Sequence, residues 1–482
     1  MVSNASSMRL RRPSIAWAAV LLVFLCAKFL LPALRFDVPL GYDAGMYRYL
    51  FLRYAEAFPF DLPDLLPWAK EHPIGLFLFS SLLVKVGVSP DILIGWLWNT
   101  MPVVFAACLA SIVFRRHGAL AAIGVLLFTL LSQPLYDGFV AMYWKTLIAL
   151  LFAVFAYDAF DRRSALFYPL AFLSVITHHQ TGLIVALATG SWWFVTLLAG
   201  PRDAFWRRMT VFCTVFGVAA FIVYLPQWER AVWSPLKSIF LLRGDDAPGG
   251  SFPDTLFYVR TMAVSILFGA YGFVRSMKER WTLWHYSVFW CAIFIVFRLV
   301  FYRRFFLQLD VFLLPFAGIA FSELWQRWHA PALRTLLVLV LSSQAVISLQ
   351  STLLREPAFT RRQVEEIVSL DSVLPDGAAI IALENVSGPW LLGWLPDHAV
   401  GAPGLFDLPG WTYEQWELFL YGTNADRESL LSALHGNVYF YLSQSFLSYY
   451  GDKAEIVLRD PCLKRISDQP LLHSVCTPVG MP

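Results

Sequence analysis

The chain has 482 residues, of which 58% are hydrophobic and only 15% are charged, and its formal net charge is +3. Soluble domains carry roughly a quarter charged residues, so most of this chain cannot face water. The charge is spread along the sequence without a basic face, so nothing indicates nucleic acid as a partner. The composition therefore assigns the chain to the integral membrane proteins.

The first apolar segment follows a short basic cluster. Arg9, Arg11 and Arg12 precede an apolar run from Ser14 to Leu34. A basic flank followed by an apolar run is common to cleaved signal peptides and to membrane anchors. This run has the ~20 residues of a spanning helix, and no small-x-small cleavage motif closes it. We therefore expect an uncleaved anchor with a cytoplasmic N-terminus.

Further apolar segments recur along the chain, and several have the ~17–25 residues that a helix needs to cross the hydrocarbon core. We place about eleven spans, at 14–34, 91–114, 119–135, 144–160, 165–179, 181–200, 209–226, 255–274, 282–301, 305–322 and 333–350. Short basic clusters fall at alternate connections, so cytoplasmic placement of these connections satisfies the positive-inside rule. The sequence thus predicts an all-α polytopic membrane protein in which the loop 35–90 and the chain after 351 face outward.

One shorter apolar stretch does not fit this alternation. It runs from His72 to Val88 and is interrupted by Lys85. If this stretch were counted as a span, every later basic cluster would lie on the outer side of the membrane, against the positive-inside rule. We expect instead a helix that lies along, or dips into, the outer membrane surface.

The chain beyond residue 350 is richer in Asp, Glu, Gly and Pro. Its short apolar runs Ala378–Leu383 and Val438–Leu442 are bounded by turn residues, which predicts buried strands. We therefore predict two domains. A transmembrane domain covers 1–350, and its first outer loop at 35–90 carries juxtamembrane helices. A small extracytoplasmic α/β domain covers 351–482.

Two cysteines and several aromatic residues stand out in this second domain. An oxidising compartment would allow a disulfide between Cys462 and Cys476. Aromatic residues gather in the segment that holds Trp390, Trp394, His398, Trp411, Tyr413 and Trp416. Such rings can stack on sugars, but packing in the domain core or against the membrane is the interpretation that the pattern favours.

The loop after the first span contains the acid best placed for chemistry at the membrane surface. Asp43 lies between Gly41 and Gly45 and close to three tyrosines. A carboxylate here could accept a proton from an incoming hydroxyl or amine, or bind a divalent cation beside a lipid phosphate. A hydrated loop without such a role is the alternative.

Four features together resemble the C-type (GT-C) glycosyltransferase superfamily. They are Asp43 in the first outer loop, the pair His72-Pro73 before a juxtamembrane helix, the alternation of basic inner loops with short outer turns such as 132–137, and the segment 302–315 with its paired arginines. Members of the superfamily often carry adjacent acids in the first loop, whereas Asp37 stands six positions before Asp43 here. This departure leaves open whether a second carboxylate or a divalent cation takes part, and no metal ligand is assigned.

The resemblance implies a sugar transferase that uses a polyprenyl-phosphate-linked donor on the outer side of the membrane. Asp43 would be the catalytic base. The residues expected to bind substrate are Tyr42, Arg48, Glu71, His72, His178, His179, Arg303 and Arg304. The acceptor, a lipid, a glycan or a protein, stays open. We expect a bacterial inner membrane, with the C-terminal domain in the periplasm.

Each of these assignments has an alternative. Arg303 and Arg304 could contact lipid headgroups only, and His178-His179 could form a polar turn at the interface. Lys145 occupies another outer turn, where a lysine usually extends to water. At the level of the whole chain, the alternatives are a transporter or flippase of lipid-linked sugars and a non-catalytic scaffold for envelope assembly. A transporter should show charges near mid-membrane, whereas the polar residues gather here at outer helix ends.

Overall fold

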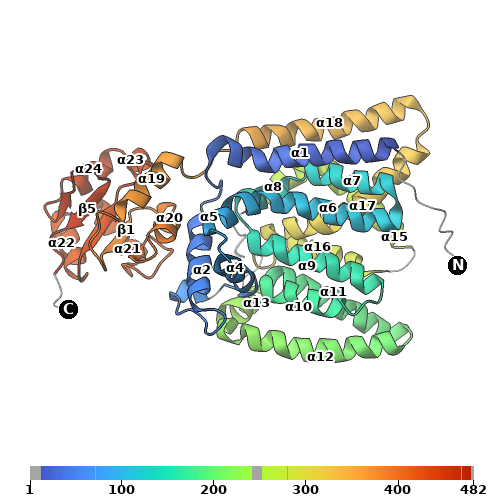
Figure 1. The fold of residues 1–482 in the computed structure, drawn as a ribbon, viewed down its shortest axis with the longest axis horizontal. Coiled ribbons are helices and arrows are strands. Elements are labelled where there is room, and N and C mark those ends of the chain that lie inside the picture. Colours follow the sequence, from blue (N-terminus) through green and yellow to red (C-terminus); the bar gives the residue numbers. More distant parts are fainter. Residues whose placement is uncertain (1–11, 71, 242–251, 279–280, 468, 479–482) are drawn as a thin grey trace. The chain divides into compact units, whose positions relative to one another are not determined.

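The computed structural model describes residues 12–70, 72–241, 252–278, 281–467 and 469–478. By their contacts these residues form two compact units, each described by itself (Figure 1). The first unit comprises the described residues of 1–35, 71–79 and 96–355, and the second those of 36–70, 80–95 and 356–482. The predicted domain boundary at residue 350 stays a prediction. By contacts, part of the first outer loop groups with the C-terminal segment.

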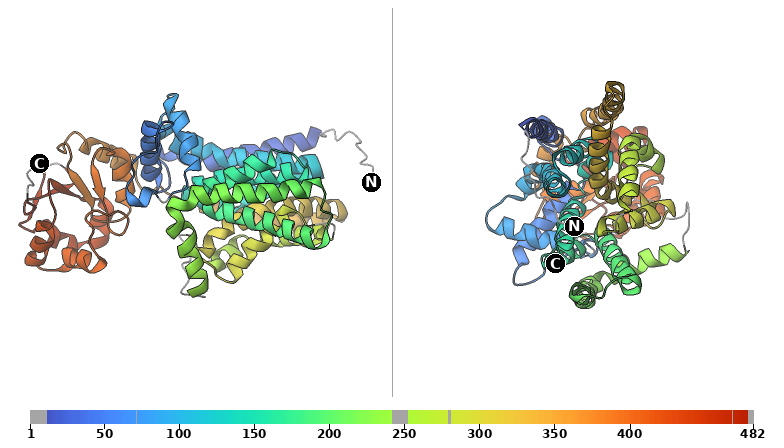
Figure 2. Two further views of the ribbon diagram at one scale, coloured as in Figure 1. Left: turned by 90° about the horizontal axis from the view of Figure 1, so that it is seen from below. Right: turned by 90° about the vertical axis from the view of Figure 1, so that its right-hand side faces the viewer.

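In the first unit the longer helices run roughly parallel or antiparallel to one another, and some shorter helices lie at an angle to them (Figure 1 and Figure 2). The helices of this unit form a bundle. They are α1 (Arg12–Phe36), α6 (Trp98–His117), α7 (Ala119–Leu131), α8 (Gln133–Val140), α9 (Trp144–Asp161), α10 (Phe167–Thr177), α11 (His179–Ala199), α12 (Ala204–Tyr224), α13 (Ser234–Leu241), α14 (Thr255–Thr261), α15 (Ala263–Ser276), α16 (Leu283–Val296), α17 (Phe305–Arg327) and α18 (Pro331–Leu353).

The polytopic membrane fold is confirmed by these helices. Among the described residues, 6 helices are long and apolar enough to cross a membrane, or up to 8 if the bent pairs α7–α8 and α14–α15 each count as one span. A helix or a bent pair occupies every predicted span, but the number of crossings stays a prediction. The stretch after His72 forms only the 11-residue helix α4 (Gly75–Lys85), shorter than a spanning helix.

Burial distinguishes the inner helices of this unit from the outer ones. The apolar window of α17 is 89% buried, whereas that of α12 is only 6% buried. Lipid chains are as apolar as core side chains, so an apolar helix is stable in either place. The central helix α17 is therefore fixed by its neighbours on all sides, and it positions the arginines that precede Phe305.

A break between α7 and α8 is stabilised by polar side chains from other helices. The two helices meet at Ser132 with a bend of 51°. The Lys28 ammonium of α1 donates to the Leu130 carbonyl oxygen at 2.7 Å, and the Ser132 hydroxyl donates to the Asp310 carboxylate of α17 at 2.5 Å. Ser132 Oγ also accepts the N–H of Leu135 at 3.0 Å and so caps α8. Irregular backbone within a membrane needs such partners because no water replaces them.

The second unit joins helices of the first outer loop to the C-terminal segment. Its helices are α2 (Ala44–Ala57), α3 (Pro67–Lys70), α5 (Pro90–Ile92), α19 (Arg361–Leu370), α20 (Ser387–Trp394), α21 (Tyr413–Tyr421), α22 (Asn424–Ser432), α23 (Gln444–Tyr450) and α24 (Asp452–Leu458). Helix α2 crosses α20 closely, because a Cβ on Gly45 would lie 1.9 Å from the Pro389 carbonyl oxygen. Only glycine allows this approach, which fixes the helix that begins after Asp43.

The C-terminal segment contains a five-stranded sheet in the order β2-β1-β3-β5-β4. The strands are β1 (Ala379–Ala382), β2 (Ala399–Gly401), β3 (Val438–Tyr441), β4 (Leu463–Arg465) and β5 (Leu471–Ser474). β1 pairs in parallel with β2 and β3, whereas β5 pairs antiparallel with β3 and β4. β1 and β3 are the two predicted strands, and the predicted small α/β fold is confirmed.

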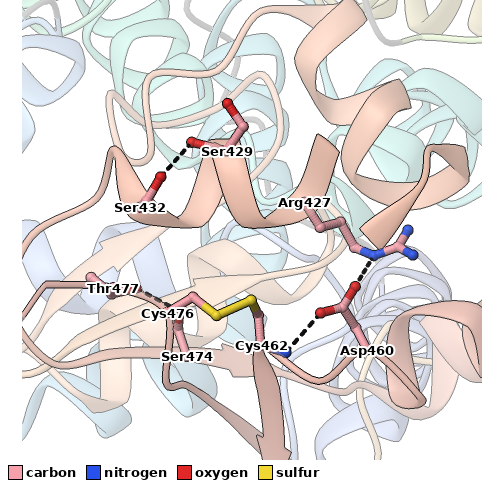
Figure 3. The surroundings of a disulfide bond; sticks show 8 residues. All are labelled: Arg427, Ser429, Ser432, Asp460, Cys462, Ser474, Cys476 and Thr477. Carbon is pink, nitrogen blue, oxygen red and sulfur yellow. Dashed lines mark hydrogen bonds and ion pairs between the residues drawn. A yellow bond between two sulfur atoms is a disulfide. The ribbon is translucent and has the colours of Figure 1, made fainter. Parts of the chain in front are cut away.

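A disulfide joins Cys462 to Cys476 at the edge of this sheet (Figure 3). Beside it, Arg427 of α22 forms a buried ion pair with Asp460. The other carboxylate oxygen of Asp460 accepts the N–H of Cys462 at 2.8 Å. Arg427 also donates to the carbonyl oxygen of Gly422 at 2.9 Å, so this buried charge is hydrogen-bonded as well as paired.

Candidate functional site

Five basic or imidazole side chains of the first unit lie where helices begin. His72 precedes α4, Lys145 is in the first turn of α9, His178 and His179 begin α11, and Arg304 directly precedes α17. We call these five residues the imidazole–cation cluster. Helix N-termini carry the positive end of the helix dipole, and Lys145 and Arg304 add side-chain charge to two of these four ends.

Contacts and electrostatic interactions connect the members of the cluster. The Lys145 ammonium lies 2.9 Å from Nδ1 of His72. The Arg304 guanidinium lies over the ring of Tyr143, which begins α9, at 5.5 Å from the ring centroid. Charge interactions link His179 to both Lys145 and Arg304, and link His72 to Lys145 and His179. The cluster therefore occupies one region of the unit.

His178 is held in one orientation by hydroxyl groups. Its Nε2 lies 3.2 Å from Thr146 Oγ1, and its Nδ1 lies 3.0 Å from Thr181 Oγ1. Nδ1 also accepts the backbone N–H of Thr181 at 3.3 Å, which caps α11. Because Nδ1 is the acceptor, the imidazole proton is on Nε2. The adjacent ring of His179 lies 5.0 Å away, between centroids.

Close packing of α4 against the end of α10 places His72. A Cβ on Gly75 would lie 2.7 Å from Thr177 Oγ1 and 3.0 Å from the Ile176 carbonyl oxygen. A larger residue at this position would separate the two helices. Gly75 therefore brings the segment that contains His72 next to the turn that contains His178.

The electrostatics of the cluster favour an anion. Burial lowers the pKa of His72 well below its ordinary value of 6.5, and the charges of Lys145 and His179 lower it further. His72 is thus neutral at neutral pH. Lys145 and Arg304 supply positive charge, and the helix N-termini supply backbone N–H donors. Phosphate groups commonly bind to this combination of cations and helix N-termini.

An apolar pocket of about 400 Å³ adjoins the cluster. Its wall comes from α11, α12, α16 and the start of α17, and includes His179, Leu183, Tyr224, Phe294, Phe301 and Phe305. The Arg304 guanidinium lies 5.0 Å from the centroid of the Phe301 ring. The pocket and the cluster therefore share a border, an arrangement that suits a ligand with an anionic head and an apolar chain.

The two predicted arginines have different surroundings. Arg303 donates from Nε to the Tyr302 hydroxyl at 3.4 Å and lies over the ring of the same residue. Arg304 instead interacts with the histidines of the cluster. Of the pair, Arg304 is the one whose charge acts on His178 and His179.

Of the predicted residues of the first outer loop that the structure describes, His72 lies in the first unit, and Tyr42, Asp43 and Arg48 lie in the second. Asp43 is half-buried at the start of α2, where its carbonyl oxygen accepts the N–H of Tyr47 at 3.1 Å and its side chain does not cap the helix. Tyr42 is 40% exposed. The carboxylate of Asp37 pairs with Arg361 of α19. The catalytic role of Asp43 and the binding role of Tyr42 stay predictions.

Arg48 connects α2 to α20. It donates to the Gly393 carbonyl oxygen at 2.6 Å and to the Asp91 carboxylate at 2.8 Å. Its guanidinium also lies 5.3 Å from the ring centroid of Trp394. These contacts give Arg48 a role in packing, and its predicted contact with substrate stays a prediction. Glu71 lies outside the described residues.

The sequence left open whether a divalent metal ion takes part in the reaction. Within the part of the chain that the structure describes, no three His, Cys, Asp or Glu side chains are grouped so that they could hold one.

From the sequence, Lys145 was not expected to bind substrate, because a lysine at the start of a helix usually extends to water. The structure turns its ammonium toward His72 instead. The only sequence feature that could have indicated a role for Lys145 is its position in an outer turn, two residues after Tyr143. This pattern is too common to identify a binding site.

No protein-family model and no curated protein sequence matches this chain. Its structure is similar to that of an oligosaccharyltransferase from Archaeoglobus fulgidus in complex with zinc and sulfate, with a TM-score of 0.62 and 14% identity over 92% of this chain and 70% of that chain. It is also similar to ArnT from Cupriavidus metallidurans, with a TM-score of 0.56 and 12% identity over 97% of this chain and 99% of that chain.

One ArnT structure is of the apo state, and another, with the same TM-score of 0.56, has undecaprenyl phosphate bound. Oligosaccharyltransferase and ArnT are both GT-C glycosyltransferases, so the predicted resemblance to that superfamily is confirmed for the fold.

Proposed function

We propose that the protein is a membrane glycosyltransferase that moves a sugar from a polyprenyl-phosphate-linked donor to a lipid, glycan or protein acceptor on the extracytoplasmic side of the membrane. The observation that carries this proposal is the imidazole–cation cluster next to an apolar pocket. A fold shared with a protein that binds undecaprenyl phosphate supports it further.

The cluster would bind the donor at its phosphate. Lys145 and Arg304 neutralise the phosphate charge, and the pocket beside Phe301 and Phe305 takes part of the polyprenyl chain. An arginine can hold phosphate oxygens through two parallel hydrogen bonds. His178 stays neutral with its proton on Nε2 and serves to position the α11 N-terminus rather than to exchange protons.

The proposed reaction is a single displacement at the anomeric carbon. The acceptor hydroxyl or amine forms the new bond to this carbon as the bond to the phosphate oxygen breaks, and the electron pair leaves with the polyprenyl phosphate. Asp43 takes the proton of the acceptor. The charge that develops on the leaving phosphate is stabilised by Arg304 and Lys145, which are in place before the reaction starts. One displacement inverts the anomeric configuration.

The test compares two acids of the same loop. Purified protein in lipid nanodiscs is incubated with radiolabelled polyprenyl-phosphate sugars, and membranes of a strain that lacks the protein supply the acceptor. We expect transfer from one donor, and we expect Asp43→Asn to lower its rate by about 10²–10⁴-fold, as removal of a general base does. Asp37→Asn is the matched control, because Asp37 pairs with Arg361 at an exposed site.

Equal rates for wild type and Asp43→Asn would remove Asp43 from the mechanism. Absence of transfer from every donor in the panel would remove the transferase function itself and favour a transporter or a scaffold.

A further inference from the structure

The C-terminal part of the second unit contains a pocket that is separate from the residues assigned to transfer. It has a volume of about 420 Å³ and lies just beyond the ends of the parallel strands β1 and β2. Glu384 follows β1, Gly404 follows β2, and both line the pocket. Ligands of open parallel sheets bind outside the carboxyl ends of the strands. The pocket therefore has the position of a binding site.

Five aromatic side chains line this pocket, namely Trp411, Tyr413, Trp416, Tyr421 and Tyr450. Trp411 packs on Phe419 of the core, with 5.0 Å between ring centroids, and also lines the pocket. Tyr413 is 77% exposed and Tyr421 is 44% exposed. Rings exposed in a concave site leave apolar surface in contact with water until a ligand covers it. The apolar face of a sugar ring is flat and stacks on such rings.

One polar group of the pocket, the Glu384 carboxylate, is ordered in advance. The Glu384 carboxylate accepts the N–H of Val386 at 2.5 Å and the hydroxyl of Ser443, which follows β3, at 2.9 Å. It therefore ties the end of β1 to the end of β3. Asn385 and Glu417 are exposed residues of the same wall. Rigid hydrogen-bonding groups raise affinity because less ordering is required on binding.

The charge of the wall selects among possible ligands. Two carboxylates, Glu384 and Glu417, line the pocket, and none of the described residues of its wall is Lys, Arg or His. Phosphates and acidic sugars are therefore repelled. Tyrosine hydroxyls and the Asn385 amide both donate and accept hydrogen bonds, as sugar hydroxyls do. The two carboxylates and the aromatic rings also attract cations, so choline is the competing ligand in the test.

We propose that this pocket binds an uncharged saccharide. The site goes beyond the proposed transfer reaction, because binding here requires neither a lipid-linked donor nor Asp43. Failure of one proposal therefore leaves the other standing.

The test measures binding to the full chain in phosphatidylcholine nanodiscs, which avoids detergents with sugar headgroups. Cellobiose, chitobiose, an arabinose disaccharide, glucuronic acid and choline are titrated, and saturation-transfer difference NMR reports binding. We expect at least one neutral disaccharide to bind, and we expect Tyr413→Ala and Glu417→Gln each to weaken it by about tenfold, the loss of one good contact. Leu418→Ala is the matched control on α21, since Leu418 is 46% exposed and does not line the pocket.

Asp43→Asn should bind the disaccharide with wild-type affinity, which separates this site from transfer. The proposal is overturned if no neutral disaccharide binds, if glucuronic acid or choline binds more tightly than all of them, or if Tyr413→Ala and Glu417→Gln bind like Leu418→Ala.

Discussion

Two groups of polar side chains inside the first unit differ in how their charges are combined. The Lys28 cluster, made of Lys28, Ser132, Asp310 and Ser348, combines a cation with a carboxylate and completes the hydrogen bonds of a helix break. The imidazole–cation cluster instead gathers Lys145 and Arg304 at helix N-termini beside a pocket.

The difference shows that a charge within a membrane bundle is not by itself a sign of function. Charges of opposite sign stabilise one another in a low-dielectric region, so the Lys28 cluster stabilises the fold. The imidazole–cation cluster brings together two cations of the same sign, Lys145 and Arg304, and in our proposal these cations bind the donor phosphate.

The largest effect expected from this contrast is on stability. Lys28→Met removes the donor to the Leu130 carbonyl oxygen and leaves the buried Asp310 carboxylate without the attraction of this cation. Removal of one partner from a buried charged group costs about 3–5 kcal/mol. We expect the thermal midpoint in nanodiscs to fall accordingly, and the exposed Lys237→Met in α13 to leave it unchanged.

The double variant Lys28→Met/Asp310→Asn sharpens this prediction. Its loss of stability should be smaller than the sum of the losses in the two single variants. Each single variant leaves one buried charge without its opposite charge, whereas the double variant removes both charges. Strictly additive losses would show that Lys28 acts on the Leu130 carbonyl alone.

The second effect concerns activity rather than stability. Arg304→Ala should lower the transfer rate by about 10²–10³-fold, as loss of one preorganised charge-stabilising group does. Arg303→Ala should lower it less, because Arg303 contacts Tyr302 rather than the histidines. The rates and the thermal midpoints are measured on the same nanodisc preparations. Equal losses from the two variants would contradict the assignment of Arg304 to the donor phosphate.

The elements of the fold that could be predicted are those determined by local sequence. Length and hydropathy located a helix in every predicted span, and the apolar runs 378–383 and 438–442 became β1 and β3. His178 and His179 were candidates because two adjacent histidines among apolar residues are costly in a membrane, and Arg304 because of its resemblance to the family's late segment. Their roles stay predictions. Each of these features is visible within a short window of the chain.

The pairings between distant residues could not be predicted. Lys28 and Ser348 are hydrogen-bonded across 320 positions, and Lys145 and His72 across 73. No local pattern states which partners meet after folding. The same limit applies to the aromatic residues of the C-terminal segment. Trp390 and Trp394 stack on each other at 4.9 Å, whereas Trp411 lines a separate pocket.

The smallest effect expected is a dependence of stability on pH. The pKa of His72 in the folded protein is below its ordinary value of 6.5, because of burial and of the charges of Lys145 and His179. Between these two pKa values the unfolded chain binds the proton and the folded chain does not. Stability is therefore complete above about pH 6.5 and falls as the pH decreases below it, by at most about 1.4 kcal/mol per pH unit for one proton.

Lys145→Met tests the origin of this pH dependence within the imidazole–cation cluster. Removal of one positive charge raises the pKa of His72 toward its ordinary value, so the acid-sensitive window narrows and the loss of stability at about pH 5 becomes smaller than in wild type. His72→Asn removes the titrating group and should flatten the profile further, whereas Lys237→Met should keep the wild-type profile.

Thermal midpoints measured from about pH 8 to about pH 5 give the comparison. If the thermal midpoint of His72→Asn falls with decreasing pH as steeply as that of the wild type, the acid sensitivity belongs to other groups. A slope that flattens in His72→Asn but not in Lys145→Met would assign the low pKa of His72 to burial alone, and would leave Arg304 as the cation on which anion binding depends.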